Sequence, residues 1–173
     1  MPIFASFPVF FKETPINLKN SSQLFDELAI LGSSLLVSNL SKIYSGILKP
    51  QEQNEKQVTY ASKLEKNEKM IKWNNSVFKI QRKIQGLNFK PGAWTFFNGK
   101  KIKIVSSEIA KENISSKPEP GKIVDLNEDG AHINCLDGNL LIKELQNPSG
   151  KIVLAHDFFR STMTNKNIEQ FLE

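Results

Sequence analysis

Two groups of basic side chains are the residues of this sequence best suited to chemistry, and that chemistry is the binding of anions. The first group has the i, i+3, i+4 spacing of one helix face and consists of Lys79, Arg82 and Lys83. The second group directly follows an Asn-Gly pair and consists of Lys100, Lys101 and Lys103. A lysine ammonium is a flexible point charge that suits phosphate, so both groups predict a polyanion-binding surface. The alternative interpretation of either group is a solvated lysine face.

Few other side chains offer reactive or metal-binding chemistry. Cys135 is the single cysteine, which excludes an internal disulfide and a cysteine-based metal site and favours a cytoplasmic location. His132 and His156 lie far apart in the sequence, and neither has a partner at ligand spacing. His132 falls in the alternating stretch GAHINCL and is expected to be a strand residue, whereas His156 is expected to open a helix. We therefore expect no metal site and no catalytic residue in this chain.

The composition is that of a globular chain with an excess of positive charge. Its 173 residues suit one domain, or one domain plus part of another, and 39% hydrophobic and 24% charged residues are globular values. The net charge of +5 favours a polyanionic partner. No apolar run approaches the roughly 18 residues of a membrane span, and MPIFASFPVFF lacks the basic start of a signal peptide. We expect no membrane partner.

The first element predicted from hydrophobic periodicity is a helix over about residues 22–46. Its apolar stripe and the residues that widen it are Leu24, Leu28, Leu31, Leu35, Phe25, Leu36, Leu40 and Ile43. Asn20 and the two serines after it are good caps. Upstream, VFFKETPINL predicts a short strand and loop. Downstream, residues 51–72 are polar without a sustained apolar stripe and predict a linker.

From residue 76 onward the pattern predicts a helix followed by a small β-domain. SVFKIQRKIQGL has a helical stripe, and Pro91 prevents its continuation. The apolar period then becomes two, and Asn98-Gly99, Asp129-Gly130 and Asp137-Gly138 separate short strands. Five short strands with tight turns predict a mostly β fold, a small closed barrel of the OB type. AHDFFRS predicts a closing helix, which NKNIEQFLE is expected to continue.

The order of these motifs strongly resembles methionyl-tRNA formyltransferase. The matching residues of the linker and the adjoining I-x-W are Thr59, Tyr60, Ala61, Lys63, Leu64, Ile71 and Trp73. Those of the helix end and first strand are Arg82, Ile84, Asn88, Pro91, Gly92, Ala93 and Trp94. The later stretches PGKIV, DGNLLIKELQNPSGK and AHDFF also resemble the family. The resemblance covers nearly the whole chain from about residue 8.

The resemblance implies a division of the chain and a role for each part. Residues 1–50 are expected to be the last strand and helix of an α/β Rossmann-like catalytic domain, 51–72 a linker, and 73–173 an OB-like tRNA-binding domain. The family's catalytic Asn, His and Asp, and its S-L-L-P-x-x-R-G stretch beside the folate site, do not occur here. The chain alone is therefore expected to be inactive and to bind no cofactor, 10-formyltetrahydrofolate being the cofactor of the parent enzyme.

In the family, the C-terminal domain holds the tRNA backbone while the enzyme formylates initiator methionyl-tRNA for bacterial translation initiation. The resemblance thus implies tRNA as partner, and electrostatic contacts from Lys79, Arg82, Lys83, Lys90, Lys100, Lys101 and Lys103, with linker contacts from Lys63 and Lys66. Gln85 departs from the family's usual basic residue and Phe89 from its frequent proline. Trp94 is expected to be a core residue rather than a contact.

Other interpretations remain open. A sugar-nucleotide formyltransferase or a formyltetrahydrofolate dehydrogenase carries a related C-terminal barrel, and a stand-alone RNA-binding module would need no catalytic half. A separately encoded catalytic half could complete the enzyme. The leucine stripe of the first helix would lack a sheet to cover in this chain, so self-association through that helix is also expected.

Overall fold

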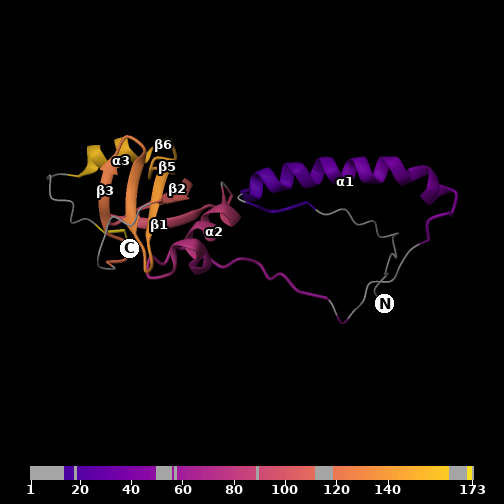
Figure 1. The fold of residues 1–173 in the computed structure, drawn as a ribbon, viewed down its shortest axis with the longest axis horizontal. Coiled ribbons are helices and arrows are strands. Elements are labelled where there is room, and N and C mark those ends of the chain that lie inside the picture. Colours follow the sequence, from indigo (N-terminus) through magenta and orange to yellow (C-terminus); the bar gives the residue numbers. More distant parts are fainter. Residues whose placement is uncertain are drawn as a thin grey trace. The chain divides into compact units, whose positions relative to one another are not determined.

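A computed structural model describes residues 14–17, 19–49, 56, 58–88, 90–111, 119–163 and 171–172. These residues fall into two compact units, Met1–Lys63 and Leu64–Glu173, each of which is considered by itself (Figure 1). The strand predicted over residues 9–18 lies largely outside the described residues. Residues 64–72, at the end of the predicted linker, belong to the second unit.

The described part of the first unit is dominated by helix α1 (Ser21–Tyr44). Its start is a capping box, because the Asn20 side chain accepts from the backbone N–H of Gln23 while the Gln23 side chain accepts from that of Asn20, at 2.9 and 3.0 Å. The predicted helix is thus confirmed to within two residues at each end. None of its residues is buried, and Phe25 and Tyr44 are 74% and 95% exposed.

Helix α1 is also the one helix among the described residues that is long and apolar enough to cross a membrane. The count of apolar runs missed this property because serines and a glycine interrupt the run without adding charge. The core helix of a water-soluble protein meets the same length and composition test, so the finding is weak evidence for a membrane span.

The second unit opens with a short 3-10 helix, η2 (Asn67–Lys69), and helix α2 (Val77–Leu87). Two side chains satisfy the free N–H groups at the start of α2: Ser76 Oγ accepts from Lys79 N at 3.4 Å and Asp137 Oδ1 accepts from Val77 N at 2.7 Å. The stripe predicted from the sequence is the buried face of the helix and contains Ile80, Ile84 and Leu87. This face fixes which side of α2 remains available to a partner.

All strands belong to one antiparallel sheet with the order β1-β2-β5-β4-β3, and β6 pairs with β5 (Figure 1). Their bounds are β1 (Ala93–Phe97), β2 (Lys100–Ile109), β3 (Ile123–Asn127), β4 (Gly130–Asn134), β5 (Asn139–Gln146) and β6 (Ile152–Leu154). The five predicted strands are therefore confirmed. The three-residue β6 was missed because IVL is too short to show an alternating pattern.

The predicted turns have the backbone that their residues favour. Asn98 and Gly99 both have positive φ, 49° and 68°, which is the requirement of a type I′ hairpin turn. Gly130 ends the β3–β4 turn with φ 143°, and a Cβ there would lie 2.1 Å from the carbonyl oxygen of Ile142. Only glycine lets the turn approach β5 this closely.

The fold class is mostly β with flanking helices, as predicted, but the described sheet is open. Strands β1 and β3 lie at its two edges and do not pair with each other. Residues 171–172 fall between these edges: Leu172 bridges to Phe97 of β1, and Phe171 bridges to Lys122, next to β3. Helix α3 (Ala155–Thr162) matches the predicted closing helix, whereas its predicted continuation is wrong at residues 171–172, which take these bridges instead.

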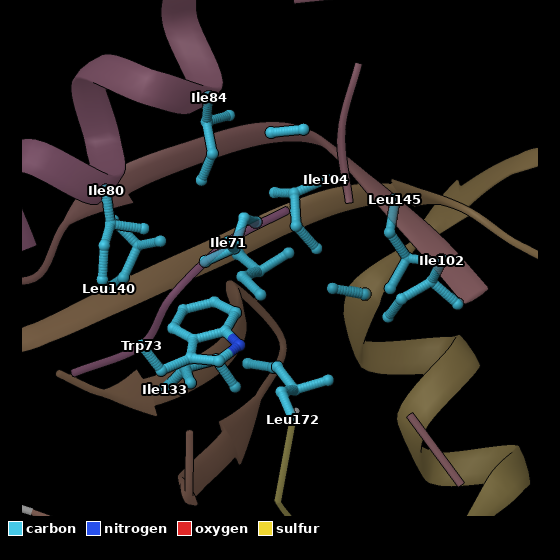
Figure 2. Packing of buried hydrophobic residues seen from close by; sticks show 14 of the residues in the cluster. Ile71, Trp73, Ile80, Ile84, Ile102, Ile104, Ile133, Leu140, Leu145 and Leu172 are labelled. Carbon is cyan, nitrogen blue, oxygen red and sulfur yellow. The ribbon is translucent and has the colours of Figure 1, made fainter. Parts of the chain in front are cut away.

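One hydrophobic core fills the inner face of the sheet (Figure 2). Burial alternates along β1, so Ala93, Thr95 and Phe97 face inward. Trp73 is 4% exposed, and its indole N–H donates to Thr95 Oγ1 at 3.0 Å. The residues on the alternate positions of β1 must therefore lie on the outer face.

Candidate nucleic-acid interface

The outer face of the β1–β2 hairpin carries aromatic and basic side chains together. In the antiparallel register Trp94 pairs with Lys103 and Phe96 pairs with Lys101. The residues between them on the two strands, Thr95 and Ile102, are fully buried on the other face, as is Ile104. The period of two thus places these four outer residues on one surface.

Lys101 and Trp94 are in direct contact on this surface. The Lys101 ammonium lies over the Trp94 ring, 4.2 Å from the ring centroid, which is a cation–π contact. The Phe96 ring meets Trp94 edge to face at 5.3 Å. Trp94 is half-buried, so the expectation that it is a core residue is wrong. The buried tryptophan of this unit is Trp73.

The segment before α2 runs beside β1 and brings further lysines to the hairpin. Ile71 N donates to the carbonyl oxygen of Trp94 at 2.8 Å, and Met70 forms a parallel bridge with Trp94. Desolvation lowers the pKa of Lys101, and repulsion from neighbouring lysines lowers it further. Those neighbours are Lys103, Lys66 and Lys69. Three other lysines therefore repel the Lys101 ammonium, and a bound polyanion would relieve that repulsion.

Lys83 of α2 has a contact within the protein. Its Nζ donates to the carbonyl oxygen of Met70 at 3.0 Å, and this bond ties α2 to the segment that carries Lys66 and Lys69. Burial lowers the pKa of Lys83, and repulsion from Lys72 adds to that effect. Lys83 thus helps to hold the basic segment in place.

The other basic residues of α2 lie on its exposed side. Lys79 is exposed. The Arg82 guanidinium lies 5.1 Å from the centroid of the Phe78 ring and donates to Gln85 Oε1 at 3.4 Å. Gln85, where the family usually has a basic residue, accordingly acts as an acceptor for Arg82.

The remaining predicted contacts are more scattered. Lys100 is the immediate neighbour of Lys101 on β2, so its side chain leaves the strand on the opposite side. Lys90 is exposed near the start of β1. Lys63 is exposed and ends the first unit, and Phe89 lies outside the described residues.

The structure therefore groups Lys66, Lys101 and Lys103 and adds residues that the sequence interpretation did not select. The additions are Lys69, Trp94 and Phe96. The aromatic residues had a readable signal, since Trp94 and Phe96 share a parity on β1. The lysines before α2 had none, because only the tertiary packing of that segment on β1 brings them to the hairpin.

The other polar groups of the second unit do not form a comparable site. His132 lies within β4 as predicted, and His156 lies at the start of α3 as predicted, with Nδ1 3.2 Å from Asp157 Oδ1. No cluster of three metal-binding side chains exists in the part of the chain that the structure describes. A shallow hollow of about 350 Å³ mixes Lys143 and His156 with three carboxylates, so it lacks the positive surplus that a polyanion needs.

Comparison with known proteins decides the family of this arrangement. The sequence profile described as "Formyl transferase, C-terminal domain" matches residues 63–162, more than half of the chain. The chain belongs to this formyl transferase family. The family resemblance stated from the sequence motifs is thereby confirmed for the C-terminal portion.

The similar curated relatives are methionyl-tRNA formyltransferases. That of Clostridium novyi is 35% identical over 140 residues, which is 81% of this chain and 45% of the relative. That of Coxiella burnetii (strain CbuK_Q154) is 33% identical over 141 residues, 82% of this chain and 44% of the relative. The chain thus spans about half the length of the curated relatives it matches.

Solved structures support the fold of this formyl transferase domain. HypX from Aquifex aeolicus in complex with tetrahydrofolic acid has a TM-score of 0.68 and 18% identity, covering 84% of this chain and 26% of that one. The N-formyltransferase from Helicobacter canadensis has a TM-score of 0.55 and 22% identity, covering 75% and 46%. At these identities the likeness concerns the fold alone.

Proposed function

We propose that this chain is part of a methionyl-tRNA formyltransferase and supplies its tRNA-backbone-binding domain. The observation that carries the proposal is the placement of Lys101 and Lys103 beside Trp94 on the outer face of the β1–β2 hairpin, next to the lysine-containing segment that Met70 bridges to β1. Lysine contacts to phosphate position an RNA without reading its sequence, so this face would orient initiator methionyl-tRNA for a catalytic domain. The names of the relatives support tRNA as the partner.

The test is tRNA binding by the chain at several salt concentrations. About four phosphate contacts predict a slope of log K against log salt of roughly −3 to −4. Little preference for initiator over elongator tRNA is expected, because the acceptor-end contacts belong to the catalytic domain of the parent enzyme. A salt-independent affinity, or none at all, would remove the proposal. A dTDP-sugar titration serves as the comparison for the sugar-nucleotide alternative.

Formyl transfer itself is proposed to require the parent's catalytic domain. Abstraction of a proton from the attacking amine and stabilisation of the tetrahedral oxyanion both need positioned side chains. The sequence motifs that supply these groups and the site for 10-formyltetrahydrofolate in the family do not occur in this chain. In an assay with charged initiator tRNA and 10-formyltetrahydrofolate, the chain alone should give no product above a no-protein control.

A further inference from the structure

The contact between Trp94 and Lys101 suggests a role for the tryptophan beyond packing. The Lys101 ammonium lies over the ring of the half-buried Trp94, 4.2 Å from the ring centroid. An unrestrained lysine loses side-chain entropy when it is fixed on a ligand. A lysine already seated on a ring has lost part of that freedom before the ligand arrives.

Three contacts constrain Trp94 and the side chains around it. The carbonyl oxygen of Trp94 accepts from Ile71 N at 2.8 Å, and Phe96 supports the indole edge at 5.3 Å. Beside the ring, the side chain of Lys103 lies against Gly92, where an added Cβ would come within 2.9 Å of Lys103 Cδ. The backbone and the neighbours of Trp94 are therefore fixed, and the position of the Lys101 ammonium is defined relative to Lys103.

We propose that Trp94 is a positioning residue for polynucleotide binding: its ring holds the Lys101 ammonium beside those of Lys103, Lys66 and Lys69 as a preformed phosphate site. This inference rests on the proposed function. The repulsion among these lysines would otherwise drive the Lys101 side chain away from the cluster. The attraction of the ring for a cation opposes that repulsion, so the charges stay together in the free protein.

Substitutions of Trp94 and of Lys101 measure separately what the aromatic ring and the lysine charge contribute to tRNA binding. Trp94→Leu keeps an apolar side chain without a π face and should weaken tRNA binding about two- to fivefold, the range expected for an exposed cation–π contact. Trp94→Phe keeps a π face and should restore most of the affinity. Lys101→Met should lower the magnitude of the salt slope by about 1. Lys151→Met, an exposed lysine of the β5–β6 turn, is the control for loss of one charge.

A double-mutant cycle decides whether Trp94 acts through Lys101. In the Lys101→Met background, Trp94→Leu should have no further effect on affinity. A loss of affinity in that background would mean that the ring contacts RNA directly, for example by stacking on a base, and would overturn the positioning role. Circular dichroism and thermal unfolding must match between variants, and Trp94→Met, which also lacks a π face, replaces Trp94→Leu in the cycle if Trp94→Leu fails to fold.

A second measurement needs no RNA. The Lys101 ε-methylene protons should show an upfield ring-current shift in the free protein, which Trp94→Phe keeps in part and Trp94→Leu removes. Unchanged Lys101 signals in Trp94→Leu would overturn the inference even if tRNA binds. An upfield-shifted Lys101 with no tRNA binding by the unmodified chain would instead contradict the proposed function, so the two failures are distinguishable.

Discussion

At the scale of single residues, the direction of each lysine decides its role. Lys101 and Lys103 share the outer face with Trp94, whereas Lys100 leaves β2 on the other side and Lys83 donates to a backbone carbonyl. The six residues of the two basic groups predicted from the sequence therefore differ in how they could contact RNA. Each can be assigned a distinct expected effect.

The first prediction concerns the two outer lysines. Replacing both Lys101 and Lys103 by Met should reduce the magnitude of the tRNA salt slope by roughly 2, because two phosphate contacts are lost. Replacing Lys100 and Lys101 should reduce it by about 1, since Lys100 points away from the cluster. Filter binding or fluorescence anisotropy at several salt concentrations measures both slopes. Equal reductions in the two variants would contradict the assigned face.

The second prediction concerns the single cysteine. Burial raises the pKa of Cys135 to about 12, whereas an exposed thiol ionises near 8.5. The unfolded chain therefore loses this proton first as pH rises, so the thiol stabilises the fold at neutral pH and that contribution decreases above about pH 8.5.

Between pH 8 and 10 this thiol should remove about 1.5–2 kcal/mol from the free energy of unfolding. Urea unfolding at both pH values measures the change. Cys135→Ala lacks the thiol and provides the control for the other groups that titrate there. If the two proteins lose the same free energy, the raised pKa is contradicted.

At the scale of elements, the two residues 171–172 cover part of the hydrophobic core. Leu172 is 3% exposed within the core, and its N–H donates to the carbonyl oxygen of Gly121 at 2.8 Å. Because residues 171–172 bridge toward both edge strands, they cover core that the open sheet would otherwise expose.

The third prediction follows from that position. Leu172→Ala should destabilise the protein by about 2–4 kcal/mol, as expected for truncating a buried leucine. Gly121→Ala should also destabilise it, since a Cβ there would lie 2.3 Å from the carbonyl oxygen of Leu172. Phe171→Ala, at a position 45% exposed, is the matched control and should cost clearly less. Chemical denaturation measures all three, and equal effects of Leu172→Ala and Phe171→Ala would show that the segment does not close the core.

At the scale of the whole molecule, the two units differ in how far their apolar side chains are buried. The second unit has a complete core, whereas α1 exposes large side chains, among them Ile30, Leu36, Val37 and Leu40. Each large aliphatic side chain left in water forgoes roughly 1.5–3 kcal/mol of burial. We propose that α1 requires a partner surface, either a second copy of this chain or a separately supplied catalytic half.

The fourth prediction tests that requirement. Purified alone, the chain should self-associate, and Leu36→Glu with Leu40→Glu should abolish the association while leaving the second unit folded, since both leucines are more than half exposed. Analytical ultracentrifugation measures the mass, and circular dichroism checks the β-domain. A monomeric unmodified chain at high concentration would contradict self-association.

The fifth prediction concerns the boundary between the units. Limited proteolysis should cut between about residues 51 and 66, where the described residues such as Tyr60 are exposed, and leave a fragment that retains Ile71. In the Leu36→Glu, Leu40→Glu variant, which is expected not to self-associate, amide hydrogen exchange should be slow in the β-domain and fast in α1. A first unit whose amides exchange as slowly as those of the β-domain would show that α1 has found a core.

Local patterns in the sequence determined the elements of this protein. The capping residues around Asn20, the Asn98-Gly99 turn and the alternation along β1 each act within a few residues, so helix α1, the hairpins and the existence of two alternating faces on β1 could be predicted. The motifs that carry the family resemblance are local in the same sense. The three-residue β6 is too short to show an alternating pattern. The bridges of residues 171–172 join positions more than 40 residues apart, so local patterns do not predict them.

Only the tertiary structure decided the composition of the candidate site. Packing of residues 66–72 on β1 brings Lys66 and Lys69 to Lys101, and the carbonyl oxygen of Met70 engages Lys83. The packing on β1 depends on backbone contacts of Met70 and Ile71 with Trp94, more than 20 residues away, about which hydrophobic periodicity carries no information. Trp94 shows the same limit: strand parity makes it either an inner or an outer residue, and the hydrogen bond from Trp73 to Thr95 settles which.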